Sequence, residues 1–429
     1  MKKIIIKNVQ YLTMTEAIIR QGDILIEGDT ITAIGQIPPT ALDGEVEVIN
    51  GENALAMPGL VNTHNHAGMT LLRSFADDME LMPWLNDKIW PAEAKMTDEH
   101  IYWGSMLAMA EMIASGTTCF ADMYSSMDHV AQAVEKTGIR ADLSRGCVEF
   151  TDHDFNSIRE NKALFDKWHG AAGGRVHVRF APHAPYTCSP AYIAKIVETA
   201  ADCGVGIHVH VAETLDEMRQ MKEGYGKTPV EYLRDLGVFQ RPTLAAHCVH
   251  VNESDMAIMK AHQVAVAHCP VSNMKLSSGT APVPALLAHG ITVGLGTDGA
   301  SSNNSMNLMR DLSVCSFLHK LVQMDPTALD AYDILQMATI GGARALGWDK
   351  EIGTLEAGKK ADVILIDLDK LHYYPHNNII SDLVYSSQGA DVKTTIINGQ
   401  IIMRDGVFTS LDIEKIKAEA TRSARAITS

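Results

Sequence analysis

The stretch Pro58-Gly59-Leu60-Val61-Asn62-Thr63-His64-Asn65-His66 decides the fold of this chain. It completes an apolar run from Leu55 to Thr63, which predicts a strand buried on both faces. His64 and His66 stand at the carboxyl end of that strand. Because alternate residues of a strand project from the same face, the two imidazoles point the same way. They can bind one metal ion or they can be two hydrogen-bonded histidines, and the motif alone leaves both readings open.

Further apolar runs follow at intervals that leave room for a helix between them. The eight runs are Leu55 to Thr63, Thr117 to Met123, Arg140 to Arg145, Val176 to Ala181, Gly206 to Val211, Thr243 to Cys248, Val264 to Cys269 and Ile291 to Gly296. Eight such βα units match the size of a (β/α)8 TIM barrel, so we predict an α/β fold of this type. A doubly wound open sheet is the alternative, but no GxGxxG motif follows the first strand.

Short β-like segments occupy the first 57 or so residues and return near the far end, where Asn398-Gly399 predicts a hairpin turn. Neither terminal piece is long enough for a core of its own, so we expect both to meet in one small β-sandwich. The predicted domains are residues 1–57 for the N-terminal part of the β-sandwich, 58–352 for the barrel, and 353–429 for the C-terminal part of the β-sandwich plus a terminal helix.

The composition excludes several classes of protein. The 429 residues are 46% hydrophobic and 21% charged, which is typical of a soluble globular protein. The formal net charge of -16 disfavours binding to nucleic acid. No apolar run approaches the roughly 20 residues of a membrane helix, and Lys7 interrupts the first apolar stretch too early for a signal peptide. The seven cysteines form no CxxC pair, so we expect no disulfide scaffold and a cytoplasmic location.

Polar side chains follow three other strands of the predicted barrel. His208 and His210 share a face of the fifth strand, and His210 lies nearer its end, where the active sites of barrels are found. His247 ends the sixth strand, and Asp298 follows the eighth. Taken alone, Asp298 is more typical of a helix cap, and His208 of a packed histidine.

Considered together, these residues favour a metal site. His64, His66, His210 and Asp298 would meet at the carboxyl rim of the barrel as three nitrogens and one oxygen. Such a set suits Zn²⁺, with Fe²⁺ or Mn²⁺ allowed by the same ligand chemistry. A metal that keeps a position for water lowers the pKa of that water toward about 7.

The same residues carry a resemblance that covers nearly the whole chain. The quoted stretch, the pair His210 and Glu213, His247, Asp298 and the segment 353–362 resemble the amidohydrolase superfamily, whose metal-dependent hydrolases have a TIM barrel. The resemblance implies one metal ion per subunit and no carboxylated lysine. Within the superfamily, the segments 66–78, 84–85 and 90–93 are similar to the 5-methylthioadenosine/S-adenosylhomocysteine deaminases.

The resemblance implies hydrolytic deamination at C6 of an adenine nucleoside, giving an inosine analogue and ammonia. Glu213 would be the acid for the ring nitrogen N1, Asp298 the base for water, and His247 the partner of the attacking water. Glu213 and Asp298 would also contact the substrate. Glu93 would hold the ribose hydroxyls, and Arg145 and His183 match two further substrate-binding positions. Each of these three has an ordinary structural reading as well, as a surface carboxylate, an ion pair and a hydrogen-bonded histidine, respectively.

Two other functions stay open. One is another aminohydrolase on the same scaffold, acting on guanine, a pterin or a triazine. The other is a metal-binding barrel without catalytic activity. The expected partner is a small nucleoside rather than a nucleic acid or a membrane, and association into homo-oligomers is expected from enzymes of this kind. The histidines at 247 and 268 each precede a cysteine, but adjacent strand residues face opposite ways, so neither Cys248 nor Cys269 is predicted to be a nucleophile.

Overall fold

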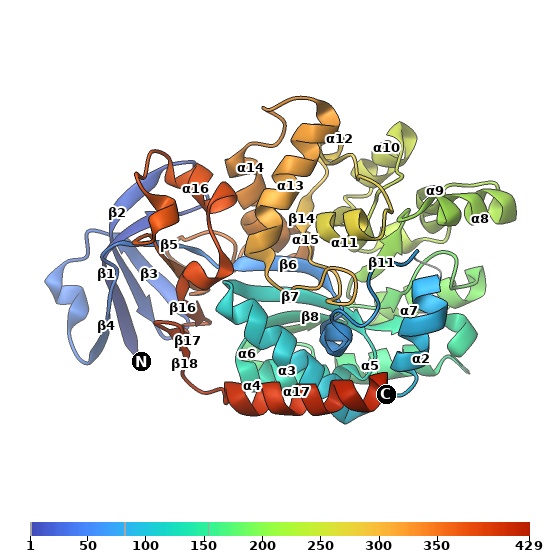
Figure 1. The fold of residues 1–429 in the computed structure, drawn as a ribbon, viewed down its shortest axis with the longest axis horizontal. Helices are drawn as coiled ribbons and strands as arrows, with labels where there is room; N and C mark the ends of the chain where they lie inside the picture. Colours follow the sequence, from blue (N-terminus) through green and yellow to red (C-terminus); the bar gives the residue numbers. More distant parts are fainter. Residues whose placement is uncertain (1, 81–82, 153) are drawn as a thin grey trace.

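Both ends of the chain build one β-rich unit at one side of the molecule (Figure 1). A computed structural model describes residues 2–80, 83–152 and 154–429. The N-terminal strands are β1 (Lys3–Leu12), β2 (Ile19–Glu27), β3 (Thr30–Gly35), β4 (Val46–Asn50) and β5 (Ala54–Pro58), and the C-terminal strands are β15 (Val363–Asp367), β16 (Val392–Ile397), β17 (Gln400–Arg404) and β18 (Val407–Phe408). They form one nine-stranded sheet in which β15 pairs antiparallel with β5. The prediction that the two termini meet in a β unit is confirmed.

The chain passes from this sheet into the barrel at Gly59. The predicted strand Leu55 to Thr63 is therefore two strands, β5 and β6 (Leu60–Asn65). Gly59 donates its N–H to the carbonyl of Asp362 at 3.0 Å. A Cβ atom at this position would lie 2.0 Å from Oγ1 of Thr118, so only glycine fits the crossing. The sequence does not predict this division, because both strands are buried on both faces and together read as one apolar run.

The remaining parallel strands form the barrel. They are β6, β7 (Thr117–Tyr124), β8 (Arg140–Cys147), β9 (Val176–Val178), β10 (Ala181–Pro182), β11 (Ile207–Val211), β12 (Thr243–His247), β13 (Ala265–His268) and β14 (Val293–Leu295). They lie in the orders β10-β8-β7-β6 and β11-β12-β13-β14. A parallel bridge between Phe180 and Ile207 joins the two halves. On the other side, Oγ1 of Thr63 donates to the carbonyl of Leu295 at 2.8 Å. The predicted barrel is confirmed.

The fourth strand differs from its prediction. The run Val176 to Ala181 is interrupted, and its two pieces, β9 and β10, both pair with β8. The N–H of Arg179 still donates to the carbonyl of Leu143 at 2.9 Å. Its guanidinium binds Asp142, which lies near the amino end of β8.

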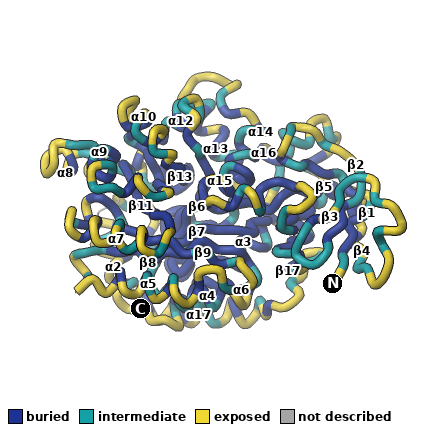
Figure 2. Tube along the Cα trace, turned by 180° about the vertical axis from the view of Figure 1, so that it is seen from behind, coloured by how far each residue is buried: buried dark blue, intermediate teal, exposed yellow. Residues whose placement is uncertain are grey.

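Helices surround the barrel, and the buried residues run along its strands (Figure 2). The helices are α2 (Trp90–Glu93), α3 (Asp98–Ala114), α4 (Met127–Thr137), α5 (Asn156–Trp168), α6 (Ala171–Gly174), α7 (Pro190–Asp202), α8 (Leu215–Tyr225), α9 (Pro229–Asp235), α10 (Glu253–Ala261), α11 (Pro270–Lys275), α12 (Val283–Ala288), α13 (Leu308–Gln323), α14 (Ala331–Gln336), α15 (Gly342–Leu346), α16 (Ile379–Tyr385) and α17 (Ile413–Thr428). The side chain of Thr97 caps α3 by accepting the N–H of His100. Within the described ranges, none of the helices combines the length and apolar character needed to cross a membrane.

The C-terminal helix α17 lies along the barrel, away from the β unit (Figure 1). Arg422 of α17 forms an ion pair with Glu99 of α3 at 2.6 Å. Ala420 and Ile427 belong to the same buried cluster as Leu72 and Trp84. The last helix therefore supports the segment between β6 and α3, which borders the site described next.

Candidate active site

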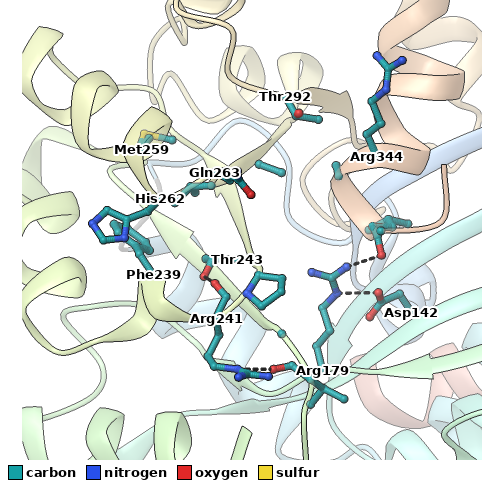
Figure 3. Close-up of a pocket in the computed structure, with 18 of the residues that line it drawn as sticks. Asp142, Arg179, Phe239, Arg241, Thr243, Met259, His262, Gln263, Thr292 and Arg344 are labelled. Carbon is teal, nitrogen blue, oxygen red and sulfur yellow. Dashed lines mark hydrogen bonds and ion pairs between the residues drawn. The ribbon is translucent and has the colours of Figure 1, made fainter. Parts of the chain in front are cut away.

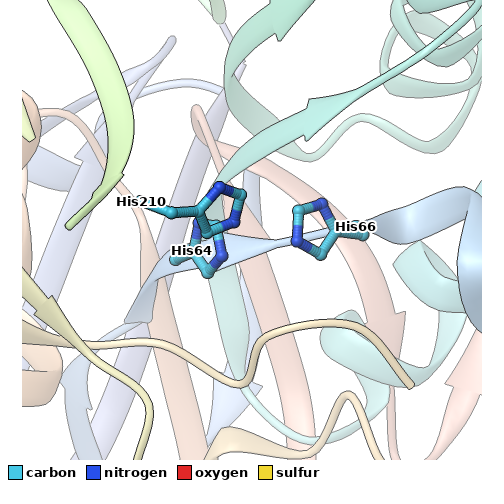
Figure 4. A group of neighbouring side chains, drawn as sticks. All are labelled: His64, His66 and His210. Atoms are coloured by element: carbon cyan, nitrogen blue, oxygen red, sulfur yellow. The ribbon is translucent and has the colours of Figure 1, made fainter. Parts of the chain in front are cut away.

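Four side chains from three strand ends converge at the carboxyl rim of the barrel. His64 lies in β6, His66 follows it, His210 lies in β11, and Asp298 follows β14. The candidate ligand atoms of His64, His66 and His210 all lie within 4.8 Å of one another (Figure 4). Oδ1 of Asp298 lies 3.5 Å from Nε2 of His64 and 3.2 Å from Nε2 of His66. The structure therefore brings together the whole predicted ligand set.

Each of the three imidazoles is held through its Nδ1 atom. Nδ1 of His66 lies 2.5 Å from the carbonyl oxygen of Met123, and Nδ1 of His210 lies 2.7 Å from that of His183. Nδ1 of His64 lies 2.9 Å from Nε2 of His208. Hydrogen bonds of this kind orient metal-binding histidines and leave Nε2 for the ion. His208 thus has the packed, hydrogen-bonding position that the sequence favours.

The protonation of these groups also fits a metal ion. Nε2 of His64 is buried and has no hydrogen-bond partner among the described residues. Burial lowers the pKa of His64 to about 4 and that of His210 well below its ordinary value, so both rings are neutral, as ligands must be. Burial would also lower the pKa of His66, but Asp298 outweighs it and raises this pKa to about 9. An ion bound here would displace that proton.

Asp298 is fixed by two serine hydroxyls. Its Oδ2 accepts hydrogen bonds from Oγ of Ser272 at 2.6 Å and from Oγ of Ser302 at 3.0 Å. Burial would raise the pKa of Asp298, but the adjacent imidazoles of His64 and His66 hold it well below the ordinary value. The carboxylate is therefore ionised. Its side chain faces the histidines, and the helix-cap reading of Asp298 finds no support here.

Glu213 and His247 face each other beside this ligand set. Nε2 of His247 lies 3.8 Å from Oε2 of Glu213. Nδ1 of His247 lies 2.9 Å from Oδ1 of Asn273, at the end of the segment Cys269-Pro270-Val271-Ser272-Asn273. Sequence reasoning missed both Ser272 and Asn273. The sequence places His247 at the end of its strand. Its spacing does not show that α11 lies beside His247 and Asp298 in the folded chain.

A buried carboxylate, Glu217, fixes the backbone of Glu213, and sequence reasoning missed it as well. One of its oxygens accepts the N–H of Ala212 at 2.9 Å and the other accepts the N–H of Glu213 at 2.8 Å. Burial raises the pKa of Glu217 to about 7. The spacing Thr214-Leu215-Asp216-Glu217 has the Ser/Thr-x-x-Glu pattern of a capping box, and this signal could have drawn attention to it.

The predicted substrate-binding residues line one cavity of about 440 Å³. Its walls include Glu93, Arg145 and His183 together with His66, His210, Glu213, His247 and Asp298. Oε1 of Glu93 accepts a hydrogen bond from the hydroxyl of Tyr124 at 2.5 Å, and burial raises the pKa of Glu93. Nε of Arg145 donates to Oε2 of Glu160 at 2.7 Å. Arg145 is therefore both an ion-pair partner and a cavity residue.

Other side chains behave as packing groups or as apolar walls. Trp84 borders the cavity, but its side chain is buried with Leu72 and Ile89. Burial raises the pKa of Cys248 and of Cys269 well above the ordinary value. Both stay protonated thiols, which agrees with the expectation that neither is a nucleophile.

The fold and this site define a class of protein. The amidohydrolase family model matches residues 55–402, and the chain belongs to that family. Within the family, the chain is 48% identical over 427 residues to the 5-methylthioadenosine/S-adenosylhomocysteine deaminase of Thermoanaerobacter pseudethanolicus, covering 98% of each. It is 50% identical over 429 residues to the enzyme of the same name from Pelotomaculum thermopropionicum, covering 99% of this chain and 98% of the relative. The predicted resemblance is confirmed.

Solved structures agree with this placement. An adenosine deaminase from Xanthomonas campestris with bound zinc superposes with a TM-score of 0.95 at 31% identity, covering 99% of this chain and 98% of that one. A triazine hydrolase from Arthrobacter aurescens has a TM-score of 0.90 at 25% identity, covering 99% and 100%. A guanine deaminase from C. acetobutylicum is 22% identical with a TM-score of 0.83, covering 93% of this chain and 99% of that one, and shares the fold.

Proposed function

We propose that this protein hydrolytically deaminates 5'-substituted adenine nucleosides, such as 5-methylthioadenosine, S-adenosylhomocysteine and adenosine, to inosine analogues and ammonia. The observation that carries the proposal is that one cavity holds a candidate metal-ligand set, the Glu213–His247 pair and Glu93. The near full-length relatives named for this reaction support it.

His64, His66, His210 and Asp298 would hold one divalent ion, for which we propose zinc, with Fe²⁺ or Mn²⁺ as alternatives. The zinc-bound neighbour supports this choice. When bound, such an ion lowers the pKa of water toward about 7 and so supplies a nucleophile near neutral pH. The unpartnered Nε2 of His64 and the neutral rings of His64 and His210 are the features of this chain that fit the ion.

The protons are moved by this chain's own carboxyl groups. Deamination at C6 needs a proton on N1 as C6 becomes tetrahedral, and Glu213 is placed in the cavity to donate it. Asp298 takes the proton of the attacking water and delivers it to the departing amino group. His247, oriented by Asn273, forms a hydrogen bond with the attacking oxygen through Nε2. As ammonia leaves, the hydroxyl proton that remains on C6 returns to Glu213. The products are the 6-oxo nucleoside and ammonia, so atoms and charge balance.

The rest of the cavity matches a nucleoside with an apolar 5'-substituent. Glu93 accepts hydrogen bonds from the ribose hydroxyls, with Tyr124 holding its carboxyl group. His183 contributes a further polar contact. Leu85, Ile89 and Trp90 line the apolar side of the cavity, where a methylthio group would pack. Arg145 would pair with the carboxylate of a homocysteine tail.

The proposal includes a cytoplasmic location, which the unpaired thiols of all seven cysteines support. It also includes self-association, which size-exclusion chromatography with light scattering measures directly.

Ammonia release from a panel of nucleosides and bases tests the function. We expect metal-loaded protein to deaminate methylthioadenosine, S-adenosylhomocysteine or adenosine with a kcat/KM at least about 100-fold above that for guanine, a pterin or a triazine. The Asp298→Asn variant is the control for contaminating deaminases. Activity on a free base or a triazine alone would support another aminohydrolase. No activity on any compound would support a non-catalytic metal-binding barrel.

A further inference from the structure

A second cavity of about 780 Å³, drawn in Figure 3, is lined by residues at the end of the barrel opposite the active site. Its walls include residues that come just before barrel strands: Gly206 before β11, Pro242 before β12, Val264 before β13 and Thr292 before β14. These are the amino ends of the strands, whereas His210 and Asp298 lie at the carboxyl ends. The cavity is therefore separate from the site described above.

Positive charge collects in this cavity. Arg179, Arg241, Lys260 and Arg344 line it, against a single carboxylate, Asp142. Three histidines, His169, His177 and His262, also line it. The chain as a whole carries a net charge of -16. On a protein with this net charge, a local excess of cations favours the binding of an anion in this cavity over binding elsewhere on the surface.

Most of these cations have no acidic partner. Arg179 is the exception: its Nε lies 2.6 Å from Oδ2 of Asp142, and its Nη2 donates to the carbonyl of Leu346 at 2.7 Å. No carboxylate of the described residues lies within 4.0 Å of the charged nitrogens of Arg241, Lys260 or Arg344. Since only one of the four cations is neutralised by an ion pair, three positive charges remain for a ligand.

The donors of Arg241 are only partly used. Its Nε donates to the carbonyl of Val205 at 3.0 Å, which fixes the side chain on the cavity wall. The hydrogen bonds among the described residues leave both Nη groups without an acceptor. A guanidinium held in this way can offer its remaining N–H groups to two oxygens of one phosphate.

One wall of the cavity is aromatic and polar. The rings of Phe239 and His262 lie 6.2 Å apart, centroid to centroid, at an angle of 49°. Gln263 and Thr292 border the same space (Figure 3). Phe239 is buried, so a flat ring would lie against the half-buried His262 while charged oxygens face the arginines. The volume is within the range of about 300–1,000 Å³ that small-molecule sites occupy.

We propose that this cavity binds an organic phosphate of nucleotide size, with Arg241 as its main anion contact. The guanidinium of Arg241, whose Nη groups have no acceptor among the described residues, selects the phosphate, and His262 accommodates the organic part. The ligand would bind without entering the active site, because the two cavities lie at opposite ends of the same strands.

Titration calorimetry with uridine monophosphate and with inorganic phosphate tests this site on the metal-loaded protein. A pyrimidine nucleotide avoids the adenine-binding cavity, and inorganic phosphate measures the contribution of charge alone. We expect saturable binding of uridine monophosphate that the double variant Arg241→Gln/Arg344→Gln weakens at least about 10-fold, because a hydrogen bond to a charged group contributes about 1.5–3 kcal/mol. The matched control is Lys195→Gln/Lys417→Gln, which removes the same charge from exposed lysines of α7 and α17 and should change binding less than about twofold.

The comparison of the two probes distinguishes the source of the phosphate. Tighter binding of the nucleotide than of inorganic phosphate supports contact with the aromatic wall, and equal binding supports recognition of phosphate alone. Should the double variant fail to fold, Gln263→Glu at an exposed wall position places a negative charge in the cavity and should weaken binding in the same way. The proposal is overturned if neither probe binds, or if the cavity variants bind as tightly as the lysine control.

Discussion

Asn273 orients His247: its Oδ1 lies 2.9 Å from Nδ1 of the imidazole, inside a fully buried contact between α11 and the end of β12. The bond directs the other ring nitrogen, Nε2, toward Glu213 at 3.8 Å. The same short segment supplies Ser272, whose hydroxyl binds Asp298. The short helix α11 thus positions two of the groups that we place in the reaction.

Removing this acceptor should slow the reaction more than it weakens substrate binding. We expect Asn273→Ala to lower kcat by about 10- to 100-fold, the range typical of groups that orient a site, with KM changed less than about threefold. Asn273→Asp keeps an oxygen acceptor for Nδ1 and should recover part of kcat. Steady-state kinetics on methylthioadenosine measures both. Equal kcat in the wild type and the alanine variant would show that Asn273 has no orienting role.

Glu93 is expected to distinguish nucleosides from free bases. Loss of hydrogen bonds from ribose hydroxyls to a carboxylate should lower kcat/KM of Glu93→Ala on adenosine analogues by about 10- to 100-fold, since such bonds contribute about 1.5–3 kcal/mol each. The 2'- and 3'-deoxy nucleosides are the controls. Because each lacks one hydroxyl, the Glu93→Ala substitution should lower kcat/KM on them by a smaller factor. If Glu93→Ala leaves kcat/KM on nucleosides unaltered, the assignment to ribose is wrong.

Arg145 should separate the two 5'-substituents. Its Nε is paired with Glu160, yet its side chain lines the cavity, so a homocysteine carboxylate can reach it. We expect Arg145→Ala to reduce kcat/KM for S-adenosylhomocysteine about 10-fold or more, and that for methylthioadenosine less than about threefold. Parallel assays on the two substrates measure the ratio. An equal loss on both substrates would contradict the role of Arg145 in binding the tail.

Asp311 should make stability fall as pH rises. Its carboxyl group is buried, Oδ2 accepts a hydrogen bond from Asn303 at 2.7 Å, and burial raises its pKa from 3.8 to about 7. The unfolded chain loses this proton at a lower pH than the folded chain does. The free energy of unfolding therefore falls as the pH rises from the unfolded pKa to the folded pKa. The neutral variant Asp311→Asn does not carry this penalty. Between about pH 5 and about pH 8, its free energy of unfolding should therefore rise relative to that of the wild type by about 2 kcal/mol.

Thermal unfolding across that range measures the difference in Tm between the two proteins. The exposed Asp325 is the control, because hydrogen bonds from the side chain and backbone of Thr327 lower its pKa. Its contribution is complete above the unfolded pKa, so Asp325→Asn should differ from the wild type by a constant amount over the same pH range. A difference for Asp311→Asn that stays constant or shrinks with rising pH would contradict the raised pKa.

The sequence predicts the barrel and the metal-ligand residues for a physical reason. His64, His66, His210 and Asp298 each end an apolar strand, and parallel strands bring their carboxyl ends to one rim. His208 shares its face of the strand with His210, and the two are told apart because His210 lies nearer the carboxyl end, where barrel sites are found. These arguments need only local spacing and one rule of topology.

The parts that the sequence does not predict depend on contacts between distant segments. Nothing near Gly59 shows that the apolar run divides between two sheets, because that division follows from packing against Thr118 and Asp362. The orienting roles of Asn273 and Tyr124 arise from where α11 and β7 lie in the folded chain. The cavity lined by Arg241 and Arg344 cannot be predicted for the same reason, because its residues come from strands, helices and loops that are distant in the sequence.

The most direct test measures bound metal and ammonia release in the same protein samples. Wild-type protein should hold about one divalent ion per chain and release ammonia from methylthioadenosine. A chelator should remove the ion and abolish ammonia release until metal is restored. His66→Ala and His210→Ala should lose most of the ion and at least about 100-fold in kcat/KM, whereas His129→Ala, a partly exposed residue of α4, should match the wild type. Full metal content and undiminished ammonia release in His66→Ala and His210→Ala would contradict the account.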